Sequence, residues 1–431
     1  MEISEIYQRF QQHPFIATDS RNCPENSLFF ALKGDRFDGN DYIGAALENG
    51  AACAVGDREG LPSGGRIIRV DNALQTLQDL ANYHRRQMKA RIIALTGTNG
   101  KTTTKELIAA ALSVRYKTLS TQGNLNNHIG VPLTLLRLKP EHEMAVIEMG
   151  ASHPGEIREL CRIALPAYGL ITNVGKAHLE GFGSFEGVVR TKTELYDFLR
   201  EKNGTVFVNQ DNRILAGYLH SLSSVCYGTL PGTFVRGKIR ESFSCLNLEW
   251  EKEKGKKEKI KTRLAGNYNF ENVLAAICVA SWFEVEAGDI NAAIENYIPQ
   301  NNRSQNQKTD KNQLIIDSYN ANPESMQAAL ENFISLKTSP KMAILGEMRE
   351  LGKYSEEEHR KIVEILLRSD IGPVLLAGEE FAKLSGLPSG WKIFSQTAAL
   401  AAYLATAEIS GHTILIKGSR GNHLEKVVEY L

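Results

Sequence analysis

IIALTGTNGKTTT, residues 92–104, is the stretch that decides how this chain folds. Four apolar residues at positions 92–95 predict a buried strand of a parallel sheet. The run KELIAAAL that follows Thr104 predicts a helix. Glycines at positions 97 and 100 make the turn between the two. The order strand, glycine-rich loop, helix is typical of a phosphate-binding loop.

The residue types in this loop suit a polyphosphate. Gly97 and Gly100 let backbone N–H groups curl around phosphate oxygens, and the helix N-terminus adds a positive dipole. Lys101 supplies a cation, and the Thr102 hydroxyl can be a ligand of magnesium. Leu95 stands where the common GxxxxGK[ST] motif has its first glycine, so this is the shorter TGTNGKTT form. A glycine-rich turn with an incidental lysine is the alternative, but the flanking strand and helix favour ATP binding.

Composition limits the class of protein. The chain has 431 residues, 42% of them hydrophobic, which predicts two to four globular domains. Its 50 basic and 50 acidic residues give no net charge, which argues against a nucleic-acid partner. Six scattered cysteines without a CxxC pair predict neither disulfides nor a zinc site. The N-terminus does not resemble a signal peptide, and no apolar run is long enough to span a membrane. We therefore expect a cytoplasmic enzyme, and a monomer.

The predicted fold class is α/β with three domains. Residues 1–88 predict a small N-terminal α/β domain, 89–300 a central P-loop parallel-sheet domain, and 301–431 a C-terminal Rossmann-like domain. In the central part, apolar strands alternate with helices and end in polar residues, as in the stretches 144–152, 168–178 and 205–212. Ligands of such sheets bind at the carboxyl ends of the strands. The basic segment 250–263 predicts a solvated hairpin that turns at Gly255.

Five further side chains are candidates for chemistry. Glu148 and Asp317 each end an apolar strand, where a carboxylate could reach ATP or its magnesium. His178 also follows a strand, and Arg303 lies just beyond the expected domain junction, from which a cation could reach the phosphates. Lys192 falls in a predicted helix. Taken singly, each also fits a structural reading: a strand-end carboxylate, a hydrogen-bonded histidine or a surface lysine.

Together these motifs resemble one family, the Mur ligases, which form amide bonds with ATP in bacterial cell-wall precursor synthesis. The resemblance covers essentially the whole chain. It rests on TGTNGKTTT, EMGAS, ITNVGKAHLEGFGS, TKTEL, GNYNFENVLAA and DSYNANPESM, in this order. DSYNANP, LGEMRELG, TDSR, KGDRFDGN and TQGNLNNHIGVPLTLL are similar to the members that add D-alanyl-D-alanine to UDP-N-acetylmuramoyl-tripeptide, and the DNPR signature of the preceding ligase is missing.

The resemblance implies roles for named residues. It implies two magnesium ions, with Thr102 and Glu148 serving the first and His178 the second, and a carbamylated Lys192 beside them. Tyr268 stands where the family motif GxHNxxN has its histidine. For ATP it implies contacts from Gly97, Thr98, Asn99, Gly100, Lys101, Thr102, Thr103, Asn269, Asn272, Arg303 and Asp317. For the UDP-peptide it implies contacts from Thr18, Asp19, Ser20, Arg21, Asn126, Asn127 and His128.

The implied reaction passes through an acyl phosphate that an amine then attacks. Because such an intermediate hydrolyses in water, we expect an ordered reaction in which the C-terminal domain closes about a hinge near residues 299–304. Three other functions stay open. One is a different amide ligase of the superfamily, such as a folylpolyglutamate synthase. The others are a non-catalytic ATP-binding module and a plain P-loop kinase, which would leave Lys192 and the second α/β domain without a role.

Overall fold

The structure is a computed structural model that describes residues 2–62, 64–240, 245–253, 255–300 and 302–431. The chain divides into two compact units. The first comprises Met1–Leu95, Tyr116–Ala151 and Gly155–Gly169, and the second Thr96–Arg115, Ser152–Pro154 and Leu170–Leu431. In the described part of the chain, no helix has the length and apolar character needed to cross a membrane.

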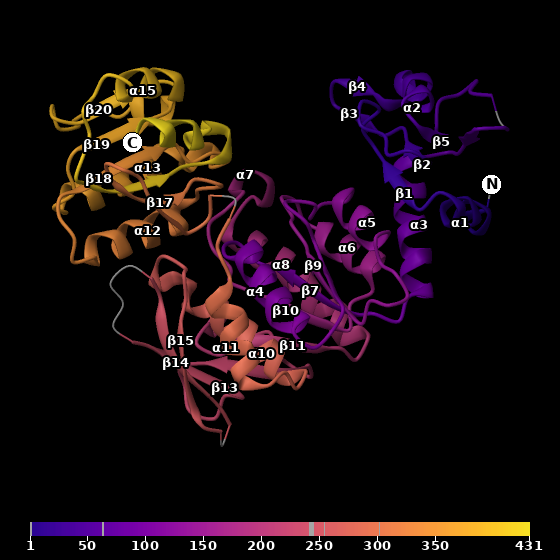
Figure 1. The fold of residues 1–431 in the computed structure, drawn as a ribbon, viewed down its shortest axis with the longest axis horizontal. Coiled ribbons are helices and arrows are strands. Elements are labelled where there is room, and N and C mark those ends of the chain that lie inside the picture. Colours follow the sequence, from indigo (N-terminus) through magenta and orange to yellow (C-terminus); the bar gives the residue numbers. More distant parts are fainter. Residues whose placement is uncertain (1, 63, 241–244, 254, 301) are drawn as a thin grey trace. The chain divides into compact units, whose positions relative to one another are not determined.

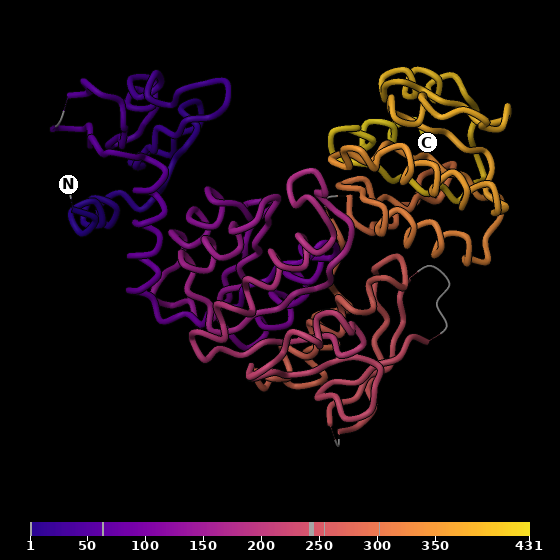
Figure 2. The backbone as a smooth tube through the Cα atoms, turned by 180° about the vertical axis from the view of Figure 1, so that it is seen from behind, coloured from indigo at the N-terminus to yellow at the C-terminus, as the bar shows by residue number. Residues whose placement is uncertain are grey.

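The first unit begins with a small parallel sheet and its helices. Its strand order is β1-β2-β5-β6 (Phe15–Ala17, Ser27–Phe30, Ala51–Gly56 and Ile67–Arg69). A short antiparallel pair, β3 (Lys33–Gly34) and β4 (Phe37–Asp38), leads into helix α2 (Ile43–Glu48). Figure 2 shows α1 (Ile3–Gln12), at the indigo end of the chain, beside the long helix α3 (Ala73–Gln87). The predicted N-terminal α/β fold is confirmed.

The same unit holds the strand that precedes the phosphate loop. The apolar run 92–95 forms β7 (Arg91–Thr96), in which every residue after Arg91 is buried. It pairs in parallel with β9 (Met144–Glu148), and β9 pairs in parallel with β8 (Thr118–Ser120). Helices α5 (Gly130–Leu135) and α6 (Glu156–Ala164) complete this part of the unit. The predicted buried strand is therefore confirmed.

The second unit contains parallel strands and an antiparallel hairpin. The sheet order is β15-β14-β13-β12-β11-β10-β7-β9-β8, and within β10 (Tyr168–Ile171) the chain passes from the first unit into the second for the last time. β11 (Thr205–Asn209), β12 (Ser223–Gly228) and β13 (Val235–Ile239) pair in parallel. β14 (Asn247–Lys252) and β15 (Lys257–Lys261) pair antiparallel, as predicted for the basic segment. The helices are α4 (Lys101–Ser113), α7 (Leu179–Phe182), α8 (Phe185–Glu201), α9 (Arg213–Ala216), α10 (Phe270–Trp282) and α11 (Ala287–Asn296).

Residues 305–431 of the second unit form a further sheet, which we call the C-terminal sheet (orange and yellow in Figure 1). Its order is β16-β17-β21-β18-β19-β20. β16 is antiparallel to β17, and β21 pairs in parallel with both β17 and β18. The strands are β16 (Gln305–Lys308), β17 (Gln313–Asp317), β18 (Lys341–Gly346), β19 (Val374–Ala377), β20 (Lys392–Phe394) and β21 (Thr413–Lys417).

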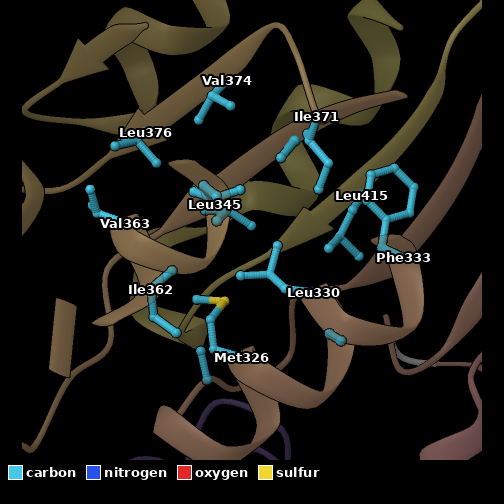
Figure 3. Packing of buried hydrophobic residues seen from close by; sticks show 14 of the residues in the cluster. Met326, Leu330, Phe333, Leu345, Ile362, Val363, Ile371, Val374, Leu376 and Leu415 are labelled. Atoms are coloured by element: carbon cyan, nitrogen blue, oxygen red, sulfur yellow. The ribbon is translucent and has the colours of Figure 1, made fainter. Parts of the chain in front are cut away.

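Apolar side chains cover both faces of the C-terminal sheet. One face packs on α12 (Pro323–Ser335) and α13 (Ser355–Leu367), the other on α15 (Thr397–Leu404). Figure 3 shows Leu330 and Phe333 of α12 in the same cluster as Leu345 and Leu415 of the sheet. Alternate residues along each strand face opposite sides, and helices on both sides bury the two faces of a doubly wound sheet. The predicted Rossmann-like fold is confirmed.

Candidate functional site

The phosphate loop is packed so closely that its glycines cannot carry a side chain. Gly97 has φ +144°, and a Cβ there would lie 1.9 Å from Thr172 Oγ1. Gly100 precedes α4 with φ +77°, and a Cβ there would lie 2.4 Å from Asn272 Oδ1. Lys101 Nζ donates to the carbonyls of Gly97 and Thr98 at 2.7 and 3.0 Å. The loop therefore has the tight turn and the nearby ammonium group that phosphate oxygens require.

Asn99, at the tip of the loop, is held by the strand end that follows β10. Its backbone N–H donates to Asn173 Oδ1 at 2.9 Å, and its carbonyl accepts from Thr172 Oγ1 at 2.7 Å. Its side-chain oxygen accepts from Asn322 Nδ2 at 2.8 Å. Asn322 is the N-cap of α12, and Pro323 is its first residue. The loop tip thus contacts the first turn of a helix of the C-terminal sheet.

The two asparagines expected near adenine bond to each other. Asn272 Oδ1 accepts from Thr104 Oγ1 at 3.0 Å, and Asn272 Nδ2 donates to Asn269 Oδ1 at 2.9 Å. Asn269 Nδ2 in turn donates to Ser304 Oγ at 3.0 Å. Both asparagines are buried. This hydrogen-bonded chain joins the helix after the phosphate loop to the segment that enters the C-terminal sheet.

Asp317 ends β17, as predicted, but its carboxylate is held by protein groups. Asp317 Oδ2 lies 2.6 Å from Nζ of Lys417, whose side chain is only 1% exposed. Asp317 Oδ1 accepts from the backbone N–H of Ser304 at 3.3 Å. Lys417 lies 100 residues away along the chain, and β21 brings it beside β17. Sequence reasoning missed Lys417 and Ser304, because neither stands in a motif and only the strand order reveals their partners.

Arg303 stacks on the aromatic ring of Tyr319. Its guanidinium carbon is 3.7 Å from the ring centroid, within the range of a cation–π contact. Arg303 Nε is buried without a hydrogen-bond partner among the described residues. On the same ring, Arg420 donates to the Tyr319 hydroxyl at 3.1 Å. Two cations therefore converge on one tyrosine just beyond Asp317.

His178 and Lys192 lie in the stretch after β10. His178 adopts a left-handed conformation, with φ +51°, and forms an ion pair with Glu350. The hydrogen bond from His178 is the main reason that the pKa of Glu350 is lowered. Lys192, on α8, is 2% exposed, and its Nζ lies 5.4 Å from the Phe182 ring centroid. His178 therefore meets an acidic partner, and the lysine predicted by motif is buried.

Glu148 and the asparagine motif belong to the first unit. Glu148 ends β9 and is 1% exposed. Its Oε1 accepts from Asn126 Nδ2 at 2.8 Å, and its backbone N–H donates to Thr121 Oγ1 at 3.0 Å. Asn127 Oδ1 accepts from the backbone N–H groups of residues 129 and 130, whereas the side chain of His128 is exposed. Of the expected substrate residues, Asn126 is thus joined to the candidate magnesium carboxylate.

The expected uridine motif, residues 18–21, follows β1 at the carboxyl end of the first sheet. Arg21 donates to both carboxylate oxygens of Asp19 at 2.9 and 2.7 Å, and these bonds lower the pKa of Asp19 to about 2. The Ser20 carbonyl accepts from Asn49, and Thr18 is half-buried. The exposed Asp19–Arg21 pair offers a donor and an acceptor to a ligand.

A magnesium ion that binds together with ATP needs few ligands from the protein. Among the residues described, no group of three or more His, Cys, Asp or Glu side chains could hold a metal ion by itself. Magnesium bound with a nucleotide needs no such cage, because phosphates and water supply most of its ligands. The buried Glu148 carboxylate and the buried Thr102 hydroxyl are hard oxygen donors of the kind that it takes.

Three family models match consecutive parts of the chain. "Mur ligase family, catalytic domain" matches residues 13–85, "Mur ligase middle domain" residues 95–280, and "Mur ligase, glutamate ligase domain" residues 302–420. The first two elements of the site, the phosphate loop and the strand end of Glu148, fall within the middle match.

Relatives match over nearly the full length. The UDP-N-acetylmuramoyl-tripeptide–D-alanyl-D-alanine ligase of Bacillus subtilis (strain 168) is 34% identical over 96% of this chain and 92% of its own. The enzyme of the same name from Escherichia coli (strain K12) is 36% identical over 96% and 93%.

Solved structures agree with the sequence matches. A crystal structure of MurF from Acinetobacter baumannii has a TM-score of 0.89 and 30% identity, over 99% of this chain and 97% of that one. The MurF ligase of Thermotoga maritima, solved in complex with ADP, has a TM-score of 0.85 and 29% identity over 97% of each chain. From its phosphate loop, its strand-end carboxylates and these full-length similarities, this chain belongs to the Mur ligase family.

Proposed function

We propose that this protein joins D-alanyl-D-alanine to UDP-N-acetylmuramoyl-tripeptide, with ATP converted to ADP and phosphate, in peptidoglycan precursor synthesis. The observation that carries this proposal is the full-length similarity, at 34–36% identity, to ligases named for that reaction. The phosphate loop supports the use of ATP, and a MurF relative was solved with ADP.

In the proposed reaction, the peptide's terminal carboxylate attacks the γ-phosphate of ATP, and ADP leaves. A carboxylate is a poor acyl donor because its leaving group would be oxide, whereas an acyl phosphate releases phosphate. The free amine of the dipeptide then attacks the carbonyl carbon, a C–N bond forms, and phosphate leaves with the C–O electron pair. Lys101 and the loop N–H groups hold the phosphates in line and offset their charge, and Arg303 adds a second cation.

Magnesium fits the donors present. The Thr102 hydroxyl and the Glu148 carboxylate are proposed for one ion, and His178 for a second. When bound, the ions would neutralise charge on the transferred phosphoryl group. Because Glu350 pairs with Nδ1 of His178, Nε2 is the ring nitrogen proposed to serve the metal, and Glu350 would orient the ring.

Lys192 is proposed to carry a carbamate. Its burial disfavours a charged ammonium, and carbamylation by carbon dioxide would turn it into an anionic oxygen ligand. Depleting dissolved carbon dioxide should lower the turnover of the wild-type enzyme, and bicarbonate should restore it. A Lys192→Ala variant that keeps full turnover would contradict this role.

The remaining roles follow the same logic. Asn269, Asn272 and Asp317 are proposed for the nucleotide, and residues 18–21 and 126–128 for the UDP-peptide. We propose domains at 1–88, 89–300 and 301–431, a monomer, and a cytoplasmic location.

Phosphate release from Mg-ATP with UDP-muramoyl-tripeptide tests the function. Release that requires D-alanyl-D-alanine, together with a product heavier by one dipeptide, supports the ligase. Lys101→Met should abolish release, whereas the exposed control Lys337→Met should leave it unchanged. Release without either peptide substrate, or none with any amine, would point to another superfamily reaction or to a silent ATP-binding module.

A further inference from the structure

Tyr268 occupies the position at which the family motif has histidine, and the structure gives this tyrosine a specific partner. Its hydroxyl lies 3.1 Å from Ser304 Oγ. Its ring packs against the apolar cluster that α12 and α13 form with the C-terminal sheet. Tyr268, in the 3-10 turn just before α10, therefore packs against the cluster of the C-terminal sheet, which belongs to the same compact unit.

Ser304 is held from several sides in an uncommon backbone conformation. It is 4% exposed and has φ +46°, a region that non-glycine residues seldom occupy and that the surrounding structure must stabilise. Its carbonyl accepts from the Ala265 N–H at 3.2 Å, and its own N–H donates to Asp317 Oδ1. Its hydroxyl oxygen accepts from Asn269 Nδ2 at 3.0 Å. One serine thus connects Tyr268, Asn269 and Asp317.

From Ser304 the connection continues to the phosphate loop. Asn269 bonds to Asn272, which accepts from Thr104 of α4. Asn272 Oδ1 is also the atom that a Cβ on Gly100 would meet. Asn269 Nδ2 also donates to the Ala265 carbonyl at 2.7 Å, so the Ser304 hydroxyl is one of two acceptors that set the orientation of this amide. A shift of that hydroxyl would change the orientation of Asn269 and, through it, of Asn272 beside the loop.

We propose that Tyr268 and Ser304 are positioning residues for the nucleotide: their hydrogen bond fixes Asn269 and Asn272 in the arrangement that binds ATP. This proposal rests on the proposed function, because it takes the asparagine pair as part of the ATP site. Neither residue needs to touch the nucleotide, since both act through Asn269.

Loss of the Tyr268–Ser304 hydrogen bond has different measurable effects in a positioning role and in a purely stabilising role. If the contact only holds the fold together, its loss lowers the melting temperature and leaves nucleotide affinity unchanged. If it positions the asparagines, its loss weakens nucleotide binding in the folded protein, and the two hydroxyls act as one unit.

Binding of ADP to the full-length protein, measured by titration calorimetry, tests this. Tyr268→Phe and Ser304→Ala should each raise the Kd for ADP about five- to tenfold, the loss expected for one buried hydrogen bond. The double variant should bind no more weakly than the worse single variant. In turnover, KM for ATP should rise more than kcat falls. Tyr196→Phe is the matched control, because the buried Tyr196 hydroxyl has no hydrogen-bond partner among the described residues.

Unchanged Kd values in Tyr268→Phe and Ser304→Ala would overturn the proposal, as would losses that add up in the double variant. ADP binding needs no peptide substrate, so the positioning role of Tyr268 and Ser304 can be tested even if the proposed ligase reaction is not found. A wild-type protein that binds ADP but forms no peptide product would refute the ligase and leave the positioning role to be decided by the variants.

Discussion

Gly100, in the phosphate loop, is constrained both by its backbone conformation and by a close contact, whereas Gly232 is constrained by its conformation alone. At Gly100 the backbone has φ +77°, and any Cβ would meet the Asn272 amide at 2.4 Å. Gly232, in the turn after β12, has φ +85° but open space around it. The two positions therefore separate the cost of the backbone conformation from the cost of the clash.

We predict that Gly100→Ala lowers kcat/KM for ATP at least about 100-fold, because the clash moves Asn272 and the loop together. Gly232→Ala carries the same backbone strain and should leave kcat/KM within about twofold. Steady-state kinetics measures both. Equal losses in the two variants would mean that strain, and not the contact with Asn272, is responsible.

Asp38 shows how a single carboxylate makes the N-terminal part sensitive to acid. The backbone N–H of Asn40 is the main cause that lowers its pKa to about 2, with further bonds from the Asn40 side chain and Arg58. A lowered pKa in the folded state means that ionised Asp38 stabilises the fold above its unfolded pKa. That contribution is lost as the pH falls towards 2.

We predict that NMR titration of the carboxyl carbons finds Asp38 titrating near pH 2. In Asp38→Asn the unfolding free energy should depend less on pH between about 4 and 2. Asp35→Asn, on the neighbouring exposed turn, is the control. An Asp38 midpoint at the ordinary value for aspartate would refute the hydrogen-bonding geometry.

At the scale of elements, the start of α12 combines a cap with a contact to the phosphate loop. Asn322 Oδ1 accepts from the Ser325 N–H, and Asn322 Nδ2 donates to Asn99. Asn322→Ala should lose both the helix cap and the hydrogen bond to Asn99, and loss of the cap should lower the unfolding free energy by about 1 kcal/mol. Asn322→Asp keeps the cap but cannot donate to Asn99.

We therefore predict near-normal urea unfolding for Asn322→Asp together with a raised KM for ATP. Asn322→Ala should show both defects. If the aspartate variant binds ATP as the wild type does, the Asn99 contact has no part in nucleotide binding.

The Lys417–Asp317 pair is an element-scale feature that the sequence could not reveal. Strand β21 places a buried ammonium beside β17. Lys417→Met would leave the Asp317 carboxylate without its cation, and we predict a loss of about 3 kcal/mol in unfolding free energy. Adding Asp317→Asn should restore part of it. A double variant no more stable than Lys417→Met would argue that the pair is not coupled.

Local patterns predicted the elements well and their partners poorly. The strand at 92–95, the helix after Thr104 and the hairpin of 250–263 follow from an apolar run, a helical pattern and a glycine turn, all of them short-range signals. Asp317 was correctly placed at a strand end, but its salt bridge depends on β21 lying between β17 and β18. Nothing within a few residues of either partner encodes that order.

At the scale of the whole molecule, motif order predicted the fold class and the family, because the six motifs span nearly the entire chain. Individual roles were harder to predict. The Glu350 partner of His178 and the Ser304 partner of Asn269 come from loops, whose contacts no periodicity encodes.

Domain closure remains our prediction for the working enzyme. Asn302 and Ser304, in the expected hinge, both have positive φ, and position 301 of that segment lies outside the described residues. Small-angle X-ray scattering should show a smaller radius of gyration when a non-hydrolysable ATP analogue and the UDP-peptide are both bound. Identical scattering with and without ligands would refute hinge closure.

The position of β21 also has a consequence for biosynthesis. It is the last of the six strands to be made, yet it fills the middle of the C-terminal sheet, between β17 and β18. Until residue 417 has left the ribosome, β17 and β18 each present an unpaired apolar edge, the kind of edge that recruits foreign strands. The nascent chain therefore carries an aggregation-prone half-sheet for roughly the time needed to translate about 70 residues, from the end of β18 to β21. Chaperone demand should peak in that interval.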